Sequence, residues 1–407
     1  MAGLAAAQAL ATSNQFEVVI HEAKPHAGGR RRSFYDSALG LDIDTGNFPV
    51  LSGWRSTLAL IDAAGARSEW REAREPGVAF ADFATGERWR LRPNSGRLPW
   101  WLLLTNRRGT RLNPPDYWAA RRLLSAPAES NVASIAPRSR IAMERLWRPL
   151  VLAGLNCPPE VASARLAGST LRSLALEGGR GMNLLTPAES FGRGFVEPVT
   201  RLVQRGGATF RFARRLAALE TGPERIGALE FEHDRIDLGA RDAVILATPW
   251  PVSALLIPGL EAPRQVSSTL TAHFAAPSPL GVEAVTGALS GAFHWLFCYR
   301  DRLSITINDA AAHIDGPKEV LAAACWRGIS LLTGLSDRLP AWRFVATRRG
   351  GFLATAEEAA RRPPCRTAWR NLFLAGGYVD SPMPGLLEGS VRSGEAAARA
   401  YIRQYEQ

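Results

Sequence analysis

The feature that most constrains the fold is the first 32 residues of this 407-residue chain. Residues 2–11 are an alanine-rich run that favours a helix, and residues 16–20 are a mainly apolar run that favours a strand. Glu22 follows that strand, and the pair Gly28-Gly29 comes shortly after it. This order matches the second half of a dinucleotide-binding βαβ unit, in which a helix N-terminus faces a pyrophosphate and a carboxylate accepts ribose hydroxyls.

Gly3 corresponds to the last glycine of the usual G-x-G-x-x-G fingerprint. The first strand and the other two glycines would precede Met1, so we expect a biological start roughly ten residues upstream or a truncated chain. A signal peptide is one alternative, although the start lacks a charged region and Glu17 follows early. An ordinary βαβ unit with a surface glutamate and a basic turn is another.

Composition indicates a soluble globular chain with room for two domains, since 46% of the residues are hydrophobic and 21% are charged. No apolar run reaches the length of a membrane-spanning helix. The net charge is +11, yet only Lys24 and Lys318 are lysines, which suggests a coding bias towards arginine. Aromatic residues do not alternate with the basic ones, so we expect no nucleic-acid partner. Attraction of the positively charged protein to an anionic bilayer surface is still an alternative.

The cysteines and histidines give no metal-binding pattern. Cys157, Cys298, Cys325 and Cys365 are scattered and form no C-x-x-C pair, and the six histidines form no H-x-x-x-H pair. We therefore expect neither a metal site nor a disulfide framework.

Between the two ends, Asp44 follows a predicted strand and begins the turn Asp44-Thr45-Gly46-Asn47. It is either a structural turn cap or a functional carboxylate. Residues 55–64 have helical spacing, and residues 78–83 and 87–91 predict a hairpin. Residues 99–104 form a bulky apolar cluster, for which core packing is favoured over a lipid pocket.

The closing block is a second anchor. Residues 371–375 predict a buried strand that leads into Gly376-Gly377 and the turn containing Asp380. Pro384, Leu386, Leu387 and Glu388 then lead into an alanine-rich helix.

These blocks resemble known flavoproteins. The segments Gly3-Leu4-x-x-Ala7, Val19-x-x-Glu22 and Gly28-Gly29-Arg30 resemble the FAD-binding signature of the glutathione-reductase-like family that includes amine oxidases and carotenoid desaturases. The Asp44 turn and Leu155-Asn156-Cys157-Pro158-Pro159 narrow the resemblance to hydroxysqualene dehydroxylases, also called squalene-associated FAD-dependent desaturases. The chain departs from that family at Phe48, where the family has histidine, at Cys157, which replaces threonine, and at Gly377, where an acidic residue is usual.

The resemblance implies an α/β fold with a discontinuous Rossmann-type FAD-binding domain and an interleaved substrate domain of mixed sheet and helices. We expect FAD-binding parts at residues 1–60, 193–262 and 366–407, and substrate-domain parts at 61–192 and 263–365. The implied cofactor contacts are Gly3, Glu22, Gly28, Gly29, Arg30, Gly376, Gly377, Pro384, Leu386, Leu387 and Glu388.

The implied reaction is reduction of hydroxysqualene to squalene in hopanoid biosynthesis. The leaving hydroxyl needs a proton donor, for which Asp44 and Asp380 are the candidate catalytic residues. The expected partner is a lipophilic isoprenoid substrate, and the expected location is cytoplasmic, with peripheral association at the inner face of the membrane as an option. The sequence does not determine the oligomeric state. An amine oxidase, a carotenoid desaturase and a degenerate, non-catalytic paralogue remain alternatives.

Overall fold

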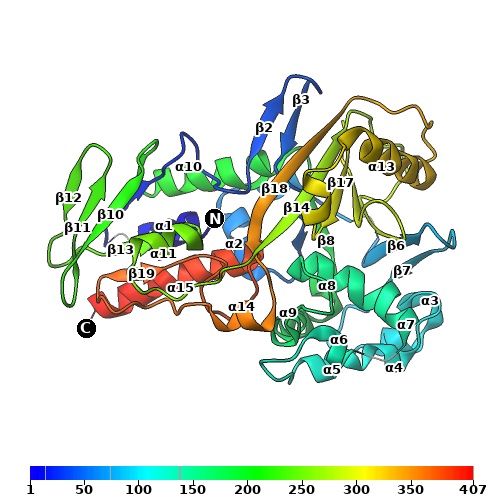
Figure 1. The fold of residues 1–407 in the computed structure, drawn as a ribbon, viewed down its shortest axis with the longest axis horizontal. Coiled ribbons are helices and arrows are strands. Elements are labelled where there is room, and N and C mark those ends of the chain that lie inside the picture. The colour runs from blue at the N-terminus through cyan, green and yellow to red at the C-terminus, as the bar shows by residue number, and fades with distance from the viewer. Residues whose placement is uncertain (14, 74, 137–138, 407) are drawn as a thin grey trace.

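The computed structural model describes residues 1–13, 15–73, 75–136 and 139–406 of the chain. Helices near both termini lie together on one side of the molecule, whereas the mixed sheet and a group of short helices form the other side (Figure 1). The chain is an α/β protein, as predicted.

The side that carries both termini contains two separate pairs of parallel strands. β1 (Val19–His21) pairs with β9 (Thr209–Arg211), and β13 (Val244–Leu246) pairs with β19 (Leu372–Leu374). Segments far apart in the sequence thus form each pair, which makes this side discontinuous. Its other elements are α1 (Ala2–Ala11), α2 (Arg55–Ala63), α10 (Glu197–Arg205), α11 (Trp250–Leu256), α15 (Leu387–Tyr405) and the antiparallel strands β10 (Leu216–Thr221), β11 (Ile226–Phe231) and β12 (Arg235–Asp237).

The first and last helices, α1 and α15, pack closely because both are rich in small residues. At Gly394 an added β-carbon would overlap the carbonyl oxygen of Ala2. At Gly3 an added β-carbon would lie 3.3 Å from that of Ala247, just after β13. Only glycine permits the approach at Gly394, so this contact fixes the distance between the two ends of the chain.

A seven-stranded mixed sheet forms the centre of the other side. Its order is β18-β14-β17-β16-β15-β6-β7, and β15 and β6 are its parallel pair. Helix α13 (Lys318–Thr333) packs against it, with Trp326 5.5 Å from Phe274 between ring centroids. The strands are β6 (Val78–Asp82), β7 (Arg88–Leu91), β14 (Val266–Phe274), β15 (Val285–Leu289), β16 (Trp295–Cys298), β17 (Leu303–Asn308) and β18 (Trp342–Phe352).

Smaller elements connect the two sides and cover the end of the sheet. The strands are β2 (Ser33–Asp36), β3 (Leu41–Asp44), β4 (Val50–Leu51), β5 (Trp70–Glu72) and β8 (Leu184–Pro187). The α-helices are α3 (Thr105–Arg108), α4 (Pro114–Tyr117), α5 (Ala119–Leu123), α6 (Val132–Ile135), α7 (Arg140–Ala142), α8 (Arg148–Leu155), α9 (Ala164–Glu177), α12 (Ala311–Ile314) and α14 (Ala356–Ala360). The tighter or wider helical turns are η1 (Arg67–Glu69), η2 (Trp100–Leu103), η3 (Met143–Trp147), η4 (Gly178–Met182) and η5 (Gly192–Val196).

The hairpin predicted at residues 78–91 is confirmed as β6 and β7, and the helix predicted at 55–64 is confirmed as α2. The prediction that residues 99–104 pack in the core is wrong. Trp101 is buried, whereas Trp100, Leu103 and Leu104 are exposed. This short segment turns tightly around one anchor residue, so its other large side chains face away from the protein.

Candidate cofactor and active site

The N-terminus of α1 lies among charged groups. No side chain caps this helix end. The pKa of the Met1 amino group falls to about 5, mainly because protein surrounds it and further because Arg31 and Arg30 are near, while Glu22 acts in the opposite direction. The helix end, Glu22 and the two arginines therefore share one region. The helix dipole and the guanidinium groups make this region favourable for an anionic group such as a pyrophosphate.

Glu22 is positioned by backbone hydrogen bonds at the end of β1. Its N–H donates to the carbonyl oxygen of Arg211 at 2.9 Å, and its own carbonyl oxygen accepts from the N–H of Arg214 at 2.9 Å. One carboxylate oxygen accepts the N–H of Lys24 at 2.9 Å. The other accepts no hydrogen bond from the described residues, which leaves it available for ligand hydroxyl groups.

The glycine arm requires backbone conformations that favour glycine. Gly28 has φ of 109° and Gly29 has φ of 57°. A β-carbon at Gly28 would lie 2.9 Å from the carbonyl oxygen of Arg31, so a larger residue would distort the turn. The arm therefore has one geometry, and that geometry sends Arg30 towards the opposite side of the molecule.

Arg30 connects the arm to β18. Its guanidinium donates to the carbonyl oxygens of Gly350 at 2.6 Å and Arg349 at 3.2 Å, and it lies 5.7 Å from the ring of Trp250. Surrounding protein lowers its pKa, yet the residue keeps solvent-accessible surface. Arg30 therefore joins the glycine arm to β18 and still keeps surface that a ligand can reach.

The C-terminal block is built from close backbone approaches. The N–H of Gly376, which follows β19, donates to Oγ of Ser393 at 3.0 Å and ties the turn to α15. A β-carbon at Gly377 would lie 2.8 Å from Cα of Gly385. The departure at Gly377 thus has a structural reason, because this backbone leaves no space there for an acidic side chain.

The turn from Pro384 to Glu388 begins α15. The N–H of Leu386 donates to the carbonyl oxygen of Pro384 at 2.7 Å, and Leu387 is buried at the first position of the helix. The carboxylate of Glu388 faces the start of α2, where it accepts the N–H of Thr57 at 2.9 Å and its hydroxyl at 2.7 Å. Its carboxylate therefore caps α2, and the backbone of this turn is the part left to face a cofactor.

Asp44 lies at the end of β3 in a buried polar cluster. It accepts hydrogen bonds from the hydroxyl of Ser33 and, at 3.0 Å, from the N–H of Phe191, and it pairs with Arg302 at 3.5 Å. Burial raises its pKa to about 6, although these three partners act to lower it. Nε2–H of His273 donates to the carbonyl oxygen of Asp44 at 2.9 Å, because a carbonyl oxygen can only accept. Burial and, secondarily, Arg302 lower the pKa of His273 to about 3, so the ring is neutral.

Asp380 lies in a different environment. It is exposed, its N–H donates to the carbonyl oxygen of Pro363 at 2.7 Å, and its carboxylate is 4.0 Å from Arg362. Arg362 is buried and donates to the carbonyl oxygens of Val379 at 2.6 Å and Met383 at 2.9 Å. The two candidate carboxylates therefore differ in access, and the structure does not bring them into contact.

Four residues that support the site were missed from the sequence. Arg302 and His273 hold Asp44, Arg362 holds the turn before α15, and the hydroxyl of Tyr378 bonds to Ser253 of α11 at 2.7 Å. Each acts on a segment distant in the sequence. The one available signal was the charged run at residues 300–302, which ends at Arg302 directly before an apolar strand.

These features fit FAD, which would extend from Glu22 along the N-terminus of α1 to the start of α15. Among the described residues, no three His, Cys, Asp or Glu side chains gather as a metal site. The class that the fold and site define is an FAD-dependent oxidoreductase, and the flavin containing amine oxidoreductase family matches residues 1–402.

Curated relatives narrow the class. Hydroxysqualene dehydroxylase of Sinorhizobium fredii is 39% identical over 98% of this chain and 95% of that protein. The proteins of the same name from Rhodopseudomonas palustris and Zymomonas mobilis are 38% and 32% identical, over 98% of this chain and 95% and 96% of those proteins. The chain therefore belongs to the flavin containing amine oxidoreductase family and, within it, to the hydroxysqualene dehydroxylases.

Solved structures agree on the fold. A putrescine oxidase variant matches with a TM-score of 0.71 at 16% identity, covering 99% of this chain and 97% of that chain. Cyclohexylamine oxidase from Brevibacterium oxydans matches with a TM-score of 0.69 at 16% identity, covering 100% and 98%. At these identities the likeness shows the fold alone.

Proposed function

We propose that this enzyme reduces hydroxysqualene to squalene, using FAD held between the two ends of the chain. The observation that carries the proposal is the contact between α1 and α15 at Ala2 and Gly394, which brings the Glu22 region and the Pro384 turn to one helix pair. Relatives named for this substrate, each matching 98% of this chain, support the choice of reaction.

The residues have separable roles towards the cofactor. Glu22 would accept the ribose hydroxyls, and the N-terminus of α1 with Arg30 would face the pyrophosphate. The start of α15 would stabilise negative charge at the edge of the flavin ring through its helix dipole. FAD supplies the chemistry of hydride transfer, and the remaining steps fall to the protein.

The hydroxyl of the substrate must leave as water, which requires a proton. We favour Asp44 over Asp380 as the group that holds this proton, because burial raises the pKa of Asp44 to about 6. Asp44 accepts the hydroxyl of Ser33, a half-buried residue that would pass the proton on. Asp380 is the alternative on grounds of access.

Apolar surroundings would protect a carbocation formed when the hydroxyl leaves. We further propose a cytoplasmic location with peripheral attachment to the membrane that contains the apolar substrate. Among the described residues, no helix is long and apolar enough to cross a bilayer.

The test uses the full chain reconstituted with FAD. Hydroxysqualene with a reductant should give squalene, whereas phytoene or an amine with oxygen should give no product. Oxidation of either alternative without squalene formation would assign the chain to another reaction, and failure to bind FAD would remove the proposal.

The proton donor is tested separately. Asp44→Asn should lower kcat at least tenfold while FAD remains bound, and Asp380→Asn should change it little. The reverse pattern would move the role to Asp380.

A further inference from the structure

An apolar surface on the helical end of the molecule has no role in the cofactor site. It consists of Leu98, Trp100, Leu103 and Leu104, and a second tryptophan, Trp118, lies between α4 and α5 nearby in the chain. Leu98 is 80% exposed and Leu103 is 72% exposed, which is far from the burial usual for leucine. We call Leu98, Trp100, Leu103 and Leu104 the apolar patch.

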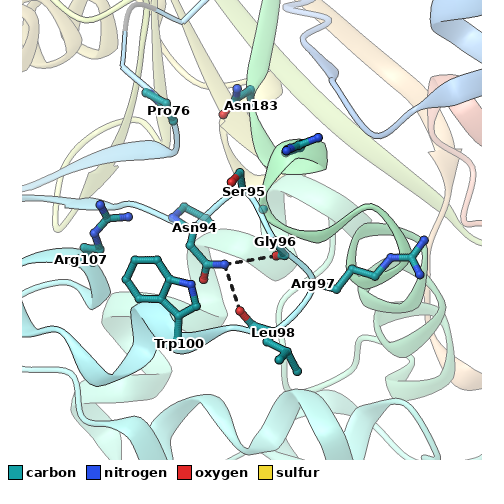
Figure 2. Close-up of a pocket in the computed structure, with 12 residues that line it drawn as sticks. Pro76, Asn94, Ser95, Gly96, Arg97, Leu98, Trp100, Arg107 and Asn183 are labelled. Atoms are coloured by element: carbon teal, nitrogen blue, oxygen red, sulfur yellow. Dashed lines mark hydrogen bonds between the residues drawn. The ribbon is translucent and has the colours of Figure 1, made fainter.

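The apolar patch is held in place by specific bonds. The side-chain nitrogen of Asn94 donates to the carbonyl oxygens of Gly96 at 3.4 Å and Leu98 at 3.0 Å, as Figure 2 shows. Its oxygen accepts the N–H of the buried Trp101 at 3.3 Å. Arg108 adds bonds to the carbonyl oxygens of Leu102 and Leu103. The protein thus fixes a turn that presents its large side chains to the outside.

The segment that carries the patch is strongly basic. Residues 93–128 contain six arginines and one carboxylate, Asp116, which is buried and engaged with the backbone of Asn113. Of these arginines, only Arg111 forms an ion pair with a described residue, Glu87. Arg107 lies 5.1 Å above the ring of Trp100. The exposed surface of this segment therefore combines apolar and cationic groups without an exposed carboxylate.

A hollow of about 880 Å³ adjoins the patch. Its lining includes Arg97, Leu98, Trp100 and Arg107, together with Gly179, Arg180 and Asn183. Figure 2 shows Trp100 and Arg107 side by side at this hollow. Gly181, next to the lining residue Arg180, accepts the N–H of Gly53 at 3.0 Å through its carbonyl oxygen, and Gly53 lies two residues before α2. The hollow therefore lies on the side of the helical region that meets the α2 segment capped by Glu388.

We propose that the apolar patch binds the surface of an anionic phospholipid bilayer. Leucine and tryptophan side chains enter the boundary between headgroups and acyl chains, and arginines contact the lipid phosphates. Attraction between basic residues and anionic lipids adds to the apolar term. A second copy of the chain fits poorly, because a two-fold contact would bring arginine-rich surfaces together without carboxylates between them.

This inference deepens the proposed function, which includes peripheral attachment to a membrane, by naming the surface that makes the attachment. Bilayer binding itself requires neither the substrate nor the reaction. The two proposals can therefore fail separately.

The test is flotation of the full chain with vesicles of phosphatidylcholine containing phosphatidylglycerol, compared with phosphatidylcholine alone. The unmodified chain should float with the anionic vesicles, and less so as salt is added. Leu98→Ser with Leu103→Ser should weaken binding about tenfold, and Arg97→Glu with Arg121→Glu should do the same.

Matched control variants change equivalent exposed residues elsewhere. Leu255→Ser with Leu280→Ser removes two exposed leucines, and Arg205→Glu with Arg327→Glu makes the same change in net charge. Both controls should float like the unmodified chain. Conversion of hydroxysqualene in detergent should be equal in all variants, since none lies at the cofactor site.

Equal flotation of patch and control variants would overturn the inference, as would equal binding to neutral and anionic vesicles. A shift from dimer to monomer in the patch variants, without loss of vesicle binding, would assign the patch to a second copy and also overturn it. Bilayer binding by a chain that forms no squalene would leave the inference intact and remove the proposed function.

Discussion

The two sides of the proposed cofactor site are built differently. On the C-terminal side, backbone meets backbone at Gly377 and Gly394, and the buried carboxylate of Glu388 caps a neighbouring helix. On the N-terminal side, Glu22 and Arg30 keep accessible polar surface. The C-terminal side thus depends on close packing, whereas the N-terminal side depends on charges available to a ligand. Substitutions on the first should damage the fold, and those on the second should damage binding.

The largest effect is expected at Gly394. Gly394→Val would force α1 away from α15, because an added side chain overlaps the Ala2 carbonyl, and should lower the free energy of unfolding by about 3 kcal/mol or more. Urea denaturation measures this change. Gly154→Ala in α8 is the control, since a β-carbon there meets nothing within 4 Å, and it should be neutral or slightly stabilising. Equal stability of Gly394→Val and the native chain would contradict the packing of the two helices.

The next effect concerns the cap on α2. Glu388→Ala leaves the N–H and hydroxyl of Thr57 without their buried acceptor and should cost about 2 kcal/mol. Glu388→Gln keeps an acceptor oxygen and should cost less. Thermal unfolding of both variants tests the order. If Glu388→Ala lost FAD without losing stability, the carboxylate would belong to the cofactor instead.

Changes on the N-terminal side should act on affinity. Glu22→Gln should weaken FAD binding roughly tenfold with little change in the unfolding of the cofactor-free chain, because it removes a charge that faces the ligand. Arg30→Met should weaken FAD binding by a similar factor and also lower stability slightly, because its guanidinium donates to carbonyl oxygens of β18. Fluorescence titration with FAD measures the affinity. Arg205→Met, at an exposed position in α10, should leave it unchanged. Destabilisation of the free chain by Glu22→Gln would erase the contrast between the two sides.

The smallest expected effect is a pH dependence of stability, to which the buried groups Asp44 and His273 contribute in opposite directions. The pKa of Asp44 rises from 3.8 to about 6, so the native state binds more protons in that range, and this term lowers stability as pH rises. The pKa of His273 falls from 6.5 to about 3, so the unfolded state binds more protons, and this term raises stability as pH rises.

Asp44→Asn should therefore make stability rise more steeply between pH 4 and about 6, whereas His273→Gln should make it rise less steeply or fall. Urea melts across this range give the slopes. Parallel curves for both variants and the native chain would show that the two pKa shifts are absent.

The sequence predicted those features that depend on neighbouring residues. The glycine arm, the hairpin at 78–91 and helix α2 followed from local spacing. The gathering of the two ends was implied by the family resemblance, and the structure accounts for it through small residues such as Gly394.

Features formed between distant segments could not be predicted. Arg302 reaches Asp44 from a strand end more than two hundred residues away, and no pattern near either residue indicates that pairing.

Residues 99–104 show a different limit of prediction from sequence. An apolar run favours burial, but whether a turn presents it outward depends on tertiary bonds such as those of Asn94. The sequence also could not indicate the burial and pairing of Asp44, because its partners Arg302 and Phe191 come from distant segments.

The most direct measurement is the FAD content of the purified full chain after reconstitution, for the native sequence and for one variant from each end. The account predicts equimolar FAD in the native chain. It predicts a marked loss of bound FAD in the N-terminal double variant Glu22→Gln with Arg30→Met. It predicts the same loss in the C-terminal variant Gly377→Val, because the new side chain would press on Gly385. Full FAD content in either variant, or none in the native chain, would contradict the claim that both ends hold one flavin.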